Sequence, residues 1–265
     1  MALTLTYRRF GCKKKPPLFV LHGLLGSSRS WLATTKDLSI HFEVFLVDLR
    51  NHGDSPHASE MSYAALSDDI LQTMDSLSLK KTTILGHSLG GKVAMYLATN
   101  YPNRVAGLII VDIAPKQYQP HYTQELKAMM AIDLSKLNSR KDADVILSDA
   151  VKDCSFRQFL LTNLDRNQHN QYFSWKANIP ALLASQKNMA ENPVGDNRQY
   201  KGSTLFIQGG QSDFIQPEDH VTIAEHFPNS SIRLIQRSGH NPHVDAMVDF
   251  AHFVTGFAER LAFKG

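Results

Sequence analysis

The sequence has little cysteine and no long apolar run. Only two of its 265 residues are cysteines, Cys12 and Cys154, and neither is followed by other metal-ligating residues at zinc-site spacing. We therefore expect free thiols in a reducing compartment. The first residues lack the apolar block of a signal peptide, and no window holds the roughly 18 consecutive apolar residues of a membrane span. These absences predict a soluble, cytoplasmic protein.

Strong charge of either sign is also missing. The formal net charge is +3, with 20% charged and 43% hydrophobic residues, which is an ordinary globular composition. The one basic run, Lys13 to Lys15, precedes two prolines and is typical of a solvated loop. We expect no nucleic-acid partner and no membrane insertion. The expected partner is a small-molecule substrate, and the expected assembly is a monomer or a homodimer.

Short apolar segments alternate with helical patterns over the first 115 residues and again after residue 200. Fully apolar strands of this length are typical of a parallel sheet covered on both faces. Repeated strand–helix–strand units predict an α/β fold with a mostly parallel sheet of about eight strands flanked by helices. The expected strands are residues 3–7, 18–21, 44–47, 82–85, 108–111, 204–207 and 232–235.

The alternation is interrupted between residues 116 and 200, a segment that we call the insertion. It contains short helical patterns and no convincing strand. Such a segment predicts a helical cap, inserted after the sixth strand, over the sheet edge where α/β proteins bind ligands. The sequence thus divides into a core, residues 1–115 and 201–265, and a cap, residues 116–200.

A candidate nucleophile lies in the sequence Gly-His-Ser-Leu-Gly at residues 86–90. This Gly-x-Ser-x-Gly motif directly follows a predicted strand and precedes a predicted helix, which is the context that a nucleophile turn requires. Such a turn projects the Ser88 hydroxyl above the sheet, and the Leu89 N–H at the helix start can stabilise an oxyanion. The motif therefore predicts Ser88 as a catalytic nucleophile.

A serine nucleophile needs a base, and that base needs an orienting carboxylate. In this kind of fold the chain order is serine, acid, histidine. Of the twelve histidines, His240 follows the last predicted strand, in a loop that returns to the catalytic edge. His243 is the alternative, but it follows Pro242 and lies in the next loop or helix. His240 is therefore the predicted general base.

Two aspartates are candidates for the acid. Asp213 follows the predicted strand 204–207, and Asp112 follows the predicted strand 108–111, next to the nucleophile strand. Either carboxylate could reach His240, and sequence order does not separate them. The second oxyanion donor should be a backbone N–H of the His-Gly-Leu segment at residues 22–24, that of Leu24.

Five sequence blocks follow one another along the chain: HGLLGS at 22–27, DLRNHGDS at 48–55, GHSLGG at 86–91, VDIAP at 111–115 and GH at 239–240. Together they resemble the small capped esterases of the α/β-hydrolase superfamily, in the branch that contains the YbfF-type esterases and the abhydrolase-domain-11 proteins. The resemblance covers essentially the whole chain.

The resemblance implies a carboxylesterase that hydrolyses short- to medium-chain acyl esters, with no cofactor and no metal. It favours Asp112 as the acid, although this chain departs from the branch by also having Asp213. The alternatives are a thioesterase, a lactonase, a perhydrolase or a carbon–carbon hydrolase on the same scaffold. A ligand-binding module without catalysis is a further alternative, against which the complete set of catalytic residues argues.

Overall fold

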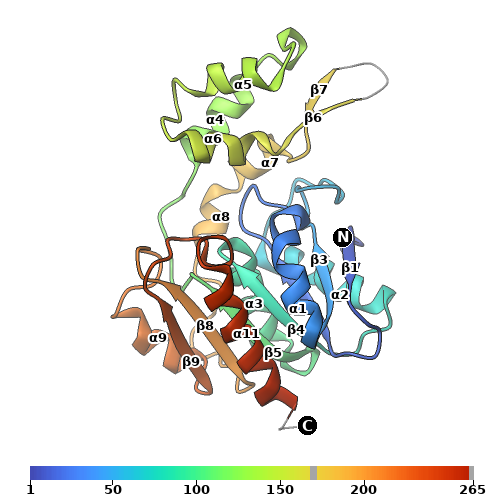
Figure 1. The fold of residues 1–265 in the computed structure, drawn as a ribbon, viewed down its shortest axis with the longest axis vertical. Coiled ribbons are helices and arrows are strands. Elements are labelled where there is room, and N and C mark those ends of the chain that lie inside the picture. Colours follow the sequence, from blue (N-terminus) through green and yellow to red (C-terminus); the bar gives the residue numbers. More distant parts are fainter. Residues whose placement is uncertain (168–171, 263–265) are drawn as a thin grey trace.

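The computed structural model describes residues 1–167 and 172–262. Within these residues the main sheet has seven strands in the order β1-β3-β2-β4-β5-β8-β9 (Figure 1), and only the β1–β3 pair is antiparallel. The mostly parallel sheet is thus confirmed. Its strands are β1 (Tyr7–Phe10), β2 (Pro17–Leu21), β3 (Glu43–Val47), β4 (Thr82–His87), β5 (Val105–Val111), β8 (Thr204–Gly209) and β9 (Ser230–Ile235).

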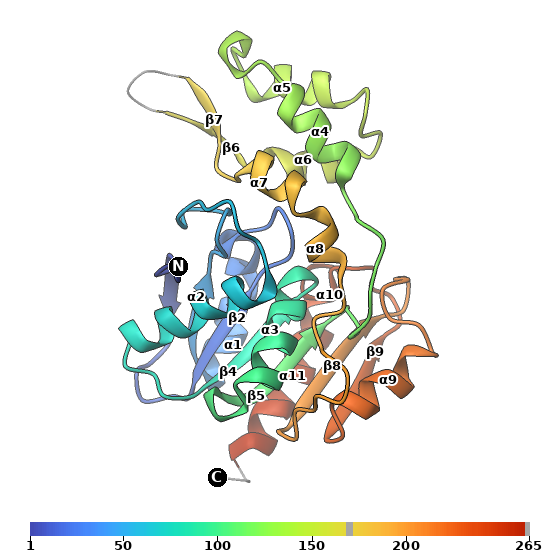
Figure 2. The same cartoon turned by 180° about the vertical axis from the view of Figure 1, so that it is seen from behind.

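Helices cover both faces of this sheet. They are α1 (Thr35–His41), α2 (Tyr63–Ser76), α3 (Leu89–Asn100), α9 (Asp219–His226), α10 (Pro242–Asp245) and α11 (Met247–Ala262), with 3₁₀ turns at Ser28–Thr34 and Pro102–Arg104. Figures 1 and 2 show α1 and α11 on one face, and α2, α3 and α9 on the other. Alternate residues of a strand point to opposite faces of the sheet and pack against the helices there. Phe19 and Phe45 belong to one buried cluster, and Val20 and Leu46 belong to the other. The strands are therefore apolar at every position.

The insertion connects β5 to β8 and forms the upper lobe of Figure 1. Its elements are α4 (Thr123–Ala131), a 3₁₀ turn (Leu134–Lys136), α5 (Arg140–Leu147), α6 (Cys154–Leu161), β6 (Leu164–Arg166), β7 (Phe173–Trp175), α7 (Ile179–Ala184) and α8 (Gln186–Ala190). The Asn163 side chain donates to Leu25 O at 2.8 Å, and Asn178 N donates to Asn51 O at 3.0 Å. The insertion is thereby attached to the loops that follow β2 and β3.

Several details differ from the prediction. In the described residues the sheet has seven strands instead of about eight, and the insertion follows the fifth strand instead of the sixth. The first strand begins at Tyr7, because the Leu3 and Leu5 amides donate to the side chains of Asp69 and Thr73 on α2. The insertion also contains the antiparallel β6–β7 hairpin, where no strand was expected.

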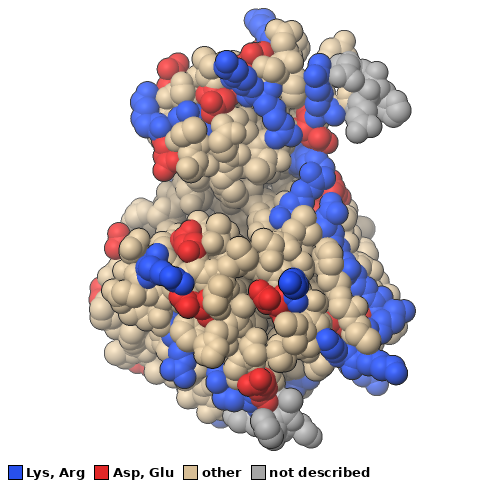
Figure 3. Space-filling view, in the orientation of Figure 1, with Lys and Arg blue, Asp and Glu red and all other residues tan. Residues whose placement is uncertain are grey.

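The surface is varied in charge. Figure 3 shows Lys, Arg, Asp and Glu side chains scattered over one face, whereas the recess between the insertion and the sheet is bordered mainly by uncharged residues.

Cys12, which follows β1, and Cys154, at the start of α6, are both exposed and make no disulfide. Within the described residues, no helix combines the length and apolarity needed to cross a membrane. Residues 168–171 and 263–265, which belong to the predicted cap and core, lie outside the described residues.

Candidate active site

Ser88 occupies the turn between β4 and α3. Its backbone has φ +51° and ψ −116°, a conformation that L-residues rarely adopt. The turn is so tight that a Cβ on Gly86 would lie 2.2 Å from the Gly90 carbonyl oxygen. The glycines of the motif are therefore required by the close approach of strand and helix, and the turn directs the serine toward the pocket above the sheet.

Asp112 follows β5 and is completely buried. Its Oδ2 lies 2.8 Å from His240 Nδ1 and also accepts a hydrogen bond from the Ser212 hydroxyl, while Oδ1 accepts from Gly209 N at 2.9 Å. Because a carboxylate can only accept, Nδ1 of His240 carries the hydrogen and Nε2 is left as the basic nitrogen. The pair thus has the tautomer that a general base requires.

Asp213, the other predicted candidate, is not brought to His240. Its side chain is exposed and accepts a hydrogen bond from Gln216 Nε2 at 3.3 Å. The neighbouring residue contacts the imidazole instead: the rings of Phe214 and His240 stack with their centroids 3.7 Å apart. Of the two aspartates left open by the sequence, Asp112 alone contacts the histidine among the described residues.

His87, the residue before Ser88, connects the nucleophile turn to the His240 loop. Its Nε2–H donates to the His240 carbonyl oxygen at 2.7 Å, and the two rings lie 4.7 Å apart. Burial, followed by the nearby His240 and His243, holds the pKa of His87 well below its ordinary value. Within the described residues, no hydrogen bond joins the Ser88 hydroxyl to His240, and catalytic hydrogen bonds of this kind often form only once substrate is bound.

His243, the alternative base, lies elsewhere. Its ring stacks on Trp31 with a centroid distance of 3.9 Å, and burial lowers its pKa to about 3. The His22 ring hydrogen-bonds to two loops: its Nε2 accepts from Leu49 N at 3.0 Å, and its Nδ1 donates to Gly23 O at 2.8 Å. His22 therefore attaches the predicted oxyanion loop to the loop that follows β3.

Both predicted oxyanion donors border the same pocket as Ser88. Leu89 begins α3, where backbone N–H groups have no partner within the helix and the helix dipole favours negative charge. Leu24 lies in a turn closed by the Gly26 N to Gly23 O hydrogen bond at 3.0 Å. Leu24 and Leu89 thus line one pocket together with Ser88, and their role as oxyanion donors stays a prediction.

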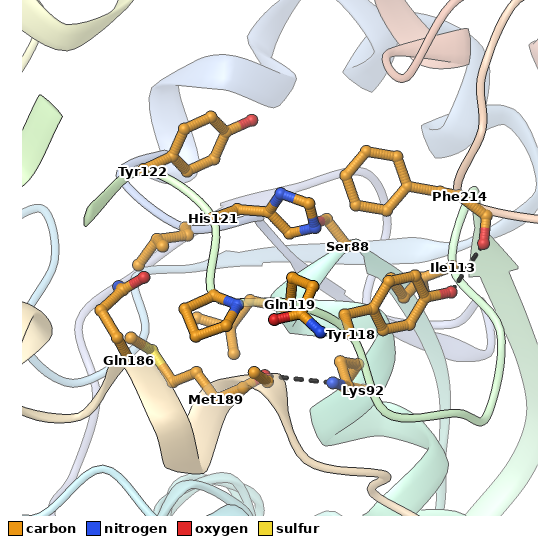
Figure 4. A pocket seen from close by; sticks show the side chains of 14 residues that line it. Ser88, Lys92, Ile113, Tyr118, Gln119, His121, Tyr122, Gln186, Met189 and Phe214 are labelled. Carbon is orange, nitrogen blue, oxygen red and sulfur yellow. Dashed lines mark hydrogen bonds between the residues drawn. The ribbon is translucent and has the colours of Figure 1, made fainter. Parts of the chain in front are cut away.

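The pocket encloses about 470 Å³, including its part open to solvent. Its lining comes from the α3 region, the loop after β5, the insertion and the loop after β8 (Figure 4). The lining residues are Leu24, Ser88, Leu89, Lys92, Ile113, Tyr118, Gln119, Pro120, His121, Tyr122, Gln186, Met189, Ala190 and Phe214. No three His, Cys, Asp or Glu side chains of the described residues gather in a way that could hold a metal ion.

Three features of this site were not predicted from the sequence: Ser212, Phe214 and Lys92. Ser212 and Phe214 lie beside the predicted Asp213, and only the fold shows that they contact the Asp112–His240 pair. Lys92 is buried in the pocket although lysine is usually exposed. Its one sequence signal is its position four residues after Ser88, in the first turn of α3.

Residues 16–246 match the model of the alpha/beta hydrolase fold family. The chain belongs to this family. It is 38% identical over 250 residues to the sn-1-specific diacylglycerol lipase ABHD11 of Mus musculus, covering 91% of this chain and 80% of the relative. Esterase YbfF of Escherichia coli is 29% identical over 233 residues, covering 86% of this chain and 87% of the relative.

A solved structure described as a marine microorganism esterase superposes with a TM-score of 0.92 at 33% identity, covering 97% of this chain and all of the other. The predicted α/β-hydrolase fold and the predicted branch are confirmed by these matches. The predicted enzyme class, a serine hydrolase of carboxylic esters, agrees with the names of these relatives.

Proposed function

We propose that the chain is a carboxylesterase that hydrolyses short- to medium-chain acyl esters with Ser88, His240 and Asp112 as its catalytic triad. The observation that carries the proposal is the 2.8 Å contact between His240 Nδ1 and the buried Asp112 carboxylate. Asp112 directly follows β5, the neighbour of the strand that carries the nucleophile turn. The contact orients the imidazole so that Nε2 is free to accept a proton.

In the proposed reaction, His240 Nε2 removes the Ser88 proton as the serine oxygen attacks the ester carbonyl carbon. The Leu24 and Leu89 amides stabilise the oxyanion that forms. The alcohol leaves with the proton from His240, and an acyl-enzyme remains. Water, deprotonated by His240, then attacks the acyl-enzyme and releases the acid.

The insertion acts as the cap in this proposal, with residues 116–200 above a core of residues 1–115 and 201–265. Residues of the insertion, such as Tyr122, Gln186 and Met189, line the pocket together with Ser88 (Figure 4). Apolar side chains such as Leu24, Ile113 and Phe214 line the pocket beside Ser88, and such a lining suits an acyl chain.

The test is hydrolysis of 4-nitrophenyl esters from acetate to laurate by the wild type, Ser88→Ala and the control Ser148→Ala. Ser148 is half-buried directly after α5, far along the chain from the proposed triad. We expect the wild type and the control to prefer the shorter esters, and Ser88→Ala to lose activity by on the order of 10⁴-fold or more. Wild-type inactivity on every ester, or an active Ser88→Ala variant, would overturn the proposal.

A further inference from the structure

Among the described residues that line the pocket, Lys92 is the only one of the types Lys, Arg, Asp and Glu. It is 3% exposed, and its Nζ donates to the Met189 carbonyl oxygen at 3.1 Å, the dashed contact in Figure 4. An ammonium group can donate three hydrogen bonds. Only this one is made to the described residues, so the ammonium retains donor capacity toward the pocket.

A buried lysine is usually paired with a carboxylate, but the groups beside the Lys92 ammonium are two aromatic rings. The nitrogen lies 5.0 Å from the Tyr118 ring centre and 5.6 Å from that of Tyr63. Neither phenol competes for an anion: Tyr118 donates to Phe214 O at 2.6 Å, and Tyr63 donates to Met189 O at 2.6 Å. The rings stabilise a cation without neutralising its charge.

Lys92 has no ion-pair partner among the described residues. Glu191 is the one acidic group whose charge raises its pKa, and burial outweighs that effect and lowers the pKa to about 7. A buried charge without a counterion is costly, and a ligand that supplies the counterion removes that cost. The pocket therefore offers a buried cation without a counterion, which is the electrostatic property that a carboxylate-binding site needs.

We propose that Lys92 binds the free carboxylate of half-esters of short dicarboxylic acids and thereby determines the substrate specificity of the pocket. The proposal rests on the proposed esterase function, with the ester carbonyl at Ser88. Lys92 lies one helical turn further along α3, about 6 Å along the helix axis. A chain with a few methylene groups between the two carbonyl carbons suits that separation.

Other polar groups of the pocket favour the same ligand. The side chains of Gln119 and Gln186 line the pocket with Lys92 and can donate hydrogen bonds to a carboxylate. No Asp or Glu is among the described lining residues, so no protein carboxylate forms part of the surface that an entering anion contacts. Hydrolysis would release the alcohol and, from the acyl-enzyme, the dicarboxylate, with water supplying the oxygen.

The experiment compares two substrates of equal length: the mono-4-nitrophenyl ester of adipic acid and the corresponding ester of adipamic acid, in which a neutral amide replaces the carboxylate. The measured quantity is the ratio of kcat/KM for the acid to that for the amide. We expect the ratio to fall about tenfold or more in Lys92→Met, because a charge-assisted hydrogen bond is lost. Lys116→Met is the matched control, since Lys116 pairs with Asp219 and does not line the pocket.

The pH dependence of this ratio in the wild type is a second readout that a structural role of Lys92 would not change. Lys92 must be protonated to attract the acid, so the ratio should fall as the pH rises through about 7. The titratable side chains of the other elements packed against it do not change charge as the pH rises through 7: burial raises the pKa of Tyr63 and Tyr118, and burial lowers that of His121 below its ordinary value. Glu191 is the acidic side chain whose charge acts on Lys92. Ionisation of the shared base affects both substrates and cancels in the ratio.

A ratio that is equal in the wild type and Lys92→Met, or constant across neutral pH, would overturn the carboxylate site. This result is distinct from failure of the esterase proposal, in which the wild type hydrolyses neither ester or Ser88→Ala hydrolyses both. If Lys92→Met does not fold, the wild-type pH profile alone decides.

Discussion

Ser88 and Asp112 directly follow two neighbouring parallel strands, and both have an unusual positive φ, +51° and +50°. Hydrogen bonds hold both in place: Ser88 N donates to Val111 O at 3.2 Å, and Asp112 N donates to Ile207 O at 2.8 Å. Positive φ costs an L-residue about 1–2 kcal/mol, less for Asp than for most. The sheet pairing on both sides offsets this strain, so the central sheet fixes the positions of the two side chains.

The contact between Asp112 and His240 predicts unequal effects of removing the two candidate acids. Asp112→Asn should lower kcat by on the order of 10⁴-fold, because an amide can no longer select the imidazole tautomer with a basic Nε2. Asp213→Asn, the matched control, should leave kcat close to that of the wild type, since Asp213 bonds only Gln216 among the described residues. Ester hydrolysis at saturating substrate measures both. A greater loss in Asp213→Asn would contradict the assignment of the acid.

Gly23 predicts how sensitive the oxyanion loop is to displacement. A Cβ at this position would lie 3.0 Å from His87 Nδ1 and 3.3 Å from Ser88 Cβ, so Gly23→Ala should push the Leu24 amide away from the nucleophile. Loss of one oxyanion donor lowers kcat about 10²-fold. Gly195→Ala is the control, because a Cβ there would lie 3.9–4.0 Å from its nearest neighbours, which are atoms of the Arg198 side chain. Wild-type kcat in a folded Gly23→Ala variant would argue against this loop as a donor.

The buried ion pair of Arg50 and Asp69 predicts a large and coupled effect on stability. Arg50 Nε and Nη2 lie 2.6 and 2.7 Å from the two carboxylate oxygens, and the side chains are 1% and 0% exposed. Arg50→Met should lower the free energy of unfolding by about 3–5 kcal/mol, since it leaves a buried charge unpaired. Urea unfolding measures this loss.

Substitution of both partners of this pair tests the cause. Arg50→Met combined with Asp69→Leu should cost less than the sum of the single changes, because no unpaired charge remains. Arg237→Met, in the exposed pair with Asp249, should change stability little. Simple additivity of the two buried substitutions would show that charge pairing is not what the single variants lose.

His243 predicts that acid destabilises the fold. Burial lowers its pKa from 6.5 to about 3, so below pH 6.5 the unfolded chain binds a proton that the folded protein does not. Stability should therefore fall as the pH decreases from about 6.5 toward 3, and His52 and His87 shift in the same direction. His243→Phe, which can still stack on Trp31, should reduce the slope of unfolding free energy against pH by up to about 1.4 kcal/mol per unit. Parallel stability–pH curves for the two proteins would refute this origin of the acid sensitivity.

Local patterns were sufficient to predict most of the sheet and the position of the nucleophile. Apolar segments such as residues 18–21 and 44–47 are strands because both faces of a parallel sheet are covered, and that burial is visible in the sequence. The Gly-x-Ser-x-Gly turn was also identifiable, since it needs a strand, two glycines and a helix in immediate succession. These features depend on residues that are close in the chain.

The choice of acid and the composition of the pocket depend on contacts distant in the chain. Asp112 and Asp213 both follow strands that end at the same sheet edge, so their positions in the sequence do not distinguish them. The features that distinguish Asp112, its positive φ and the hydrogen bond that it accepts from Ser212, are visible only in the folded structure. The β6–β7 hairpin was missed because each strand has three residues, too few to show an alternating pattern. Lys92 has the sequence context of an ordinary helix lysine, and its burial results from α8 lying over it.

The two cysteines offer a direct way to follow movement of the insertion. Cys12 lies beside the sheet and Cys154 within the upper lobe, and both thiols are exposed. Because the sequence has no third cysteine, maleimide dyes would attach at these two positions without any prior mutagenesis. Energy transfer between the dyes would then report, in the unmodified sequence, whether the lobe changes its distance from the sheet during each turnover.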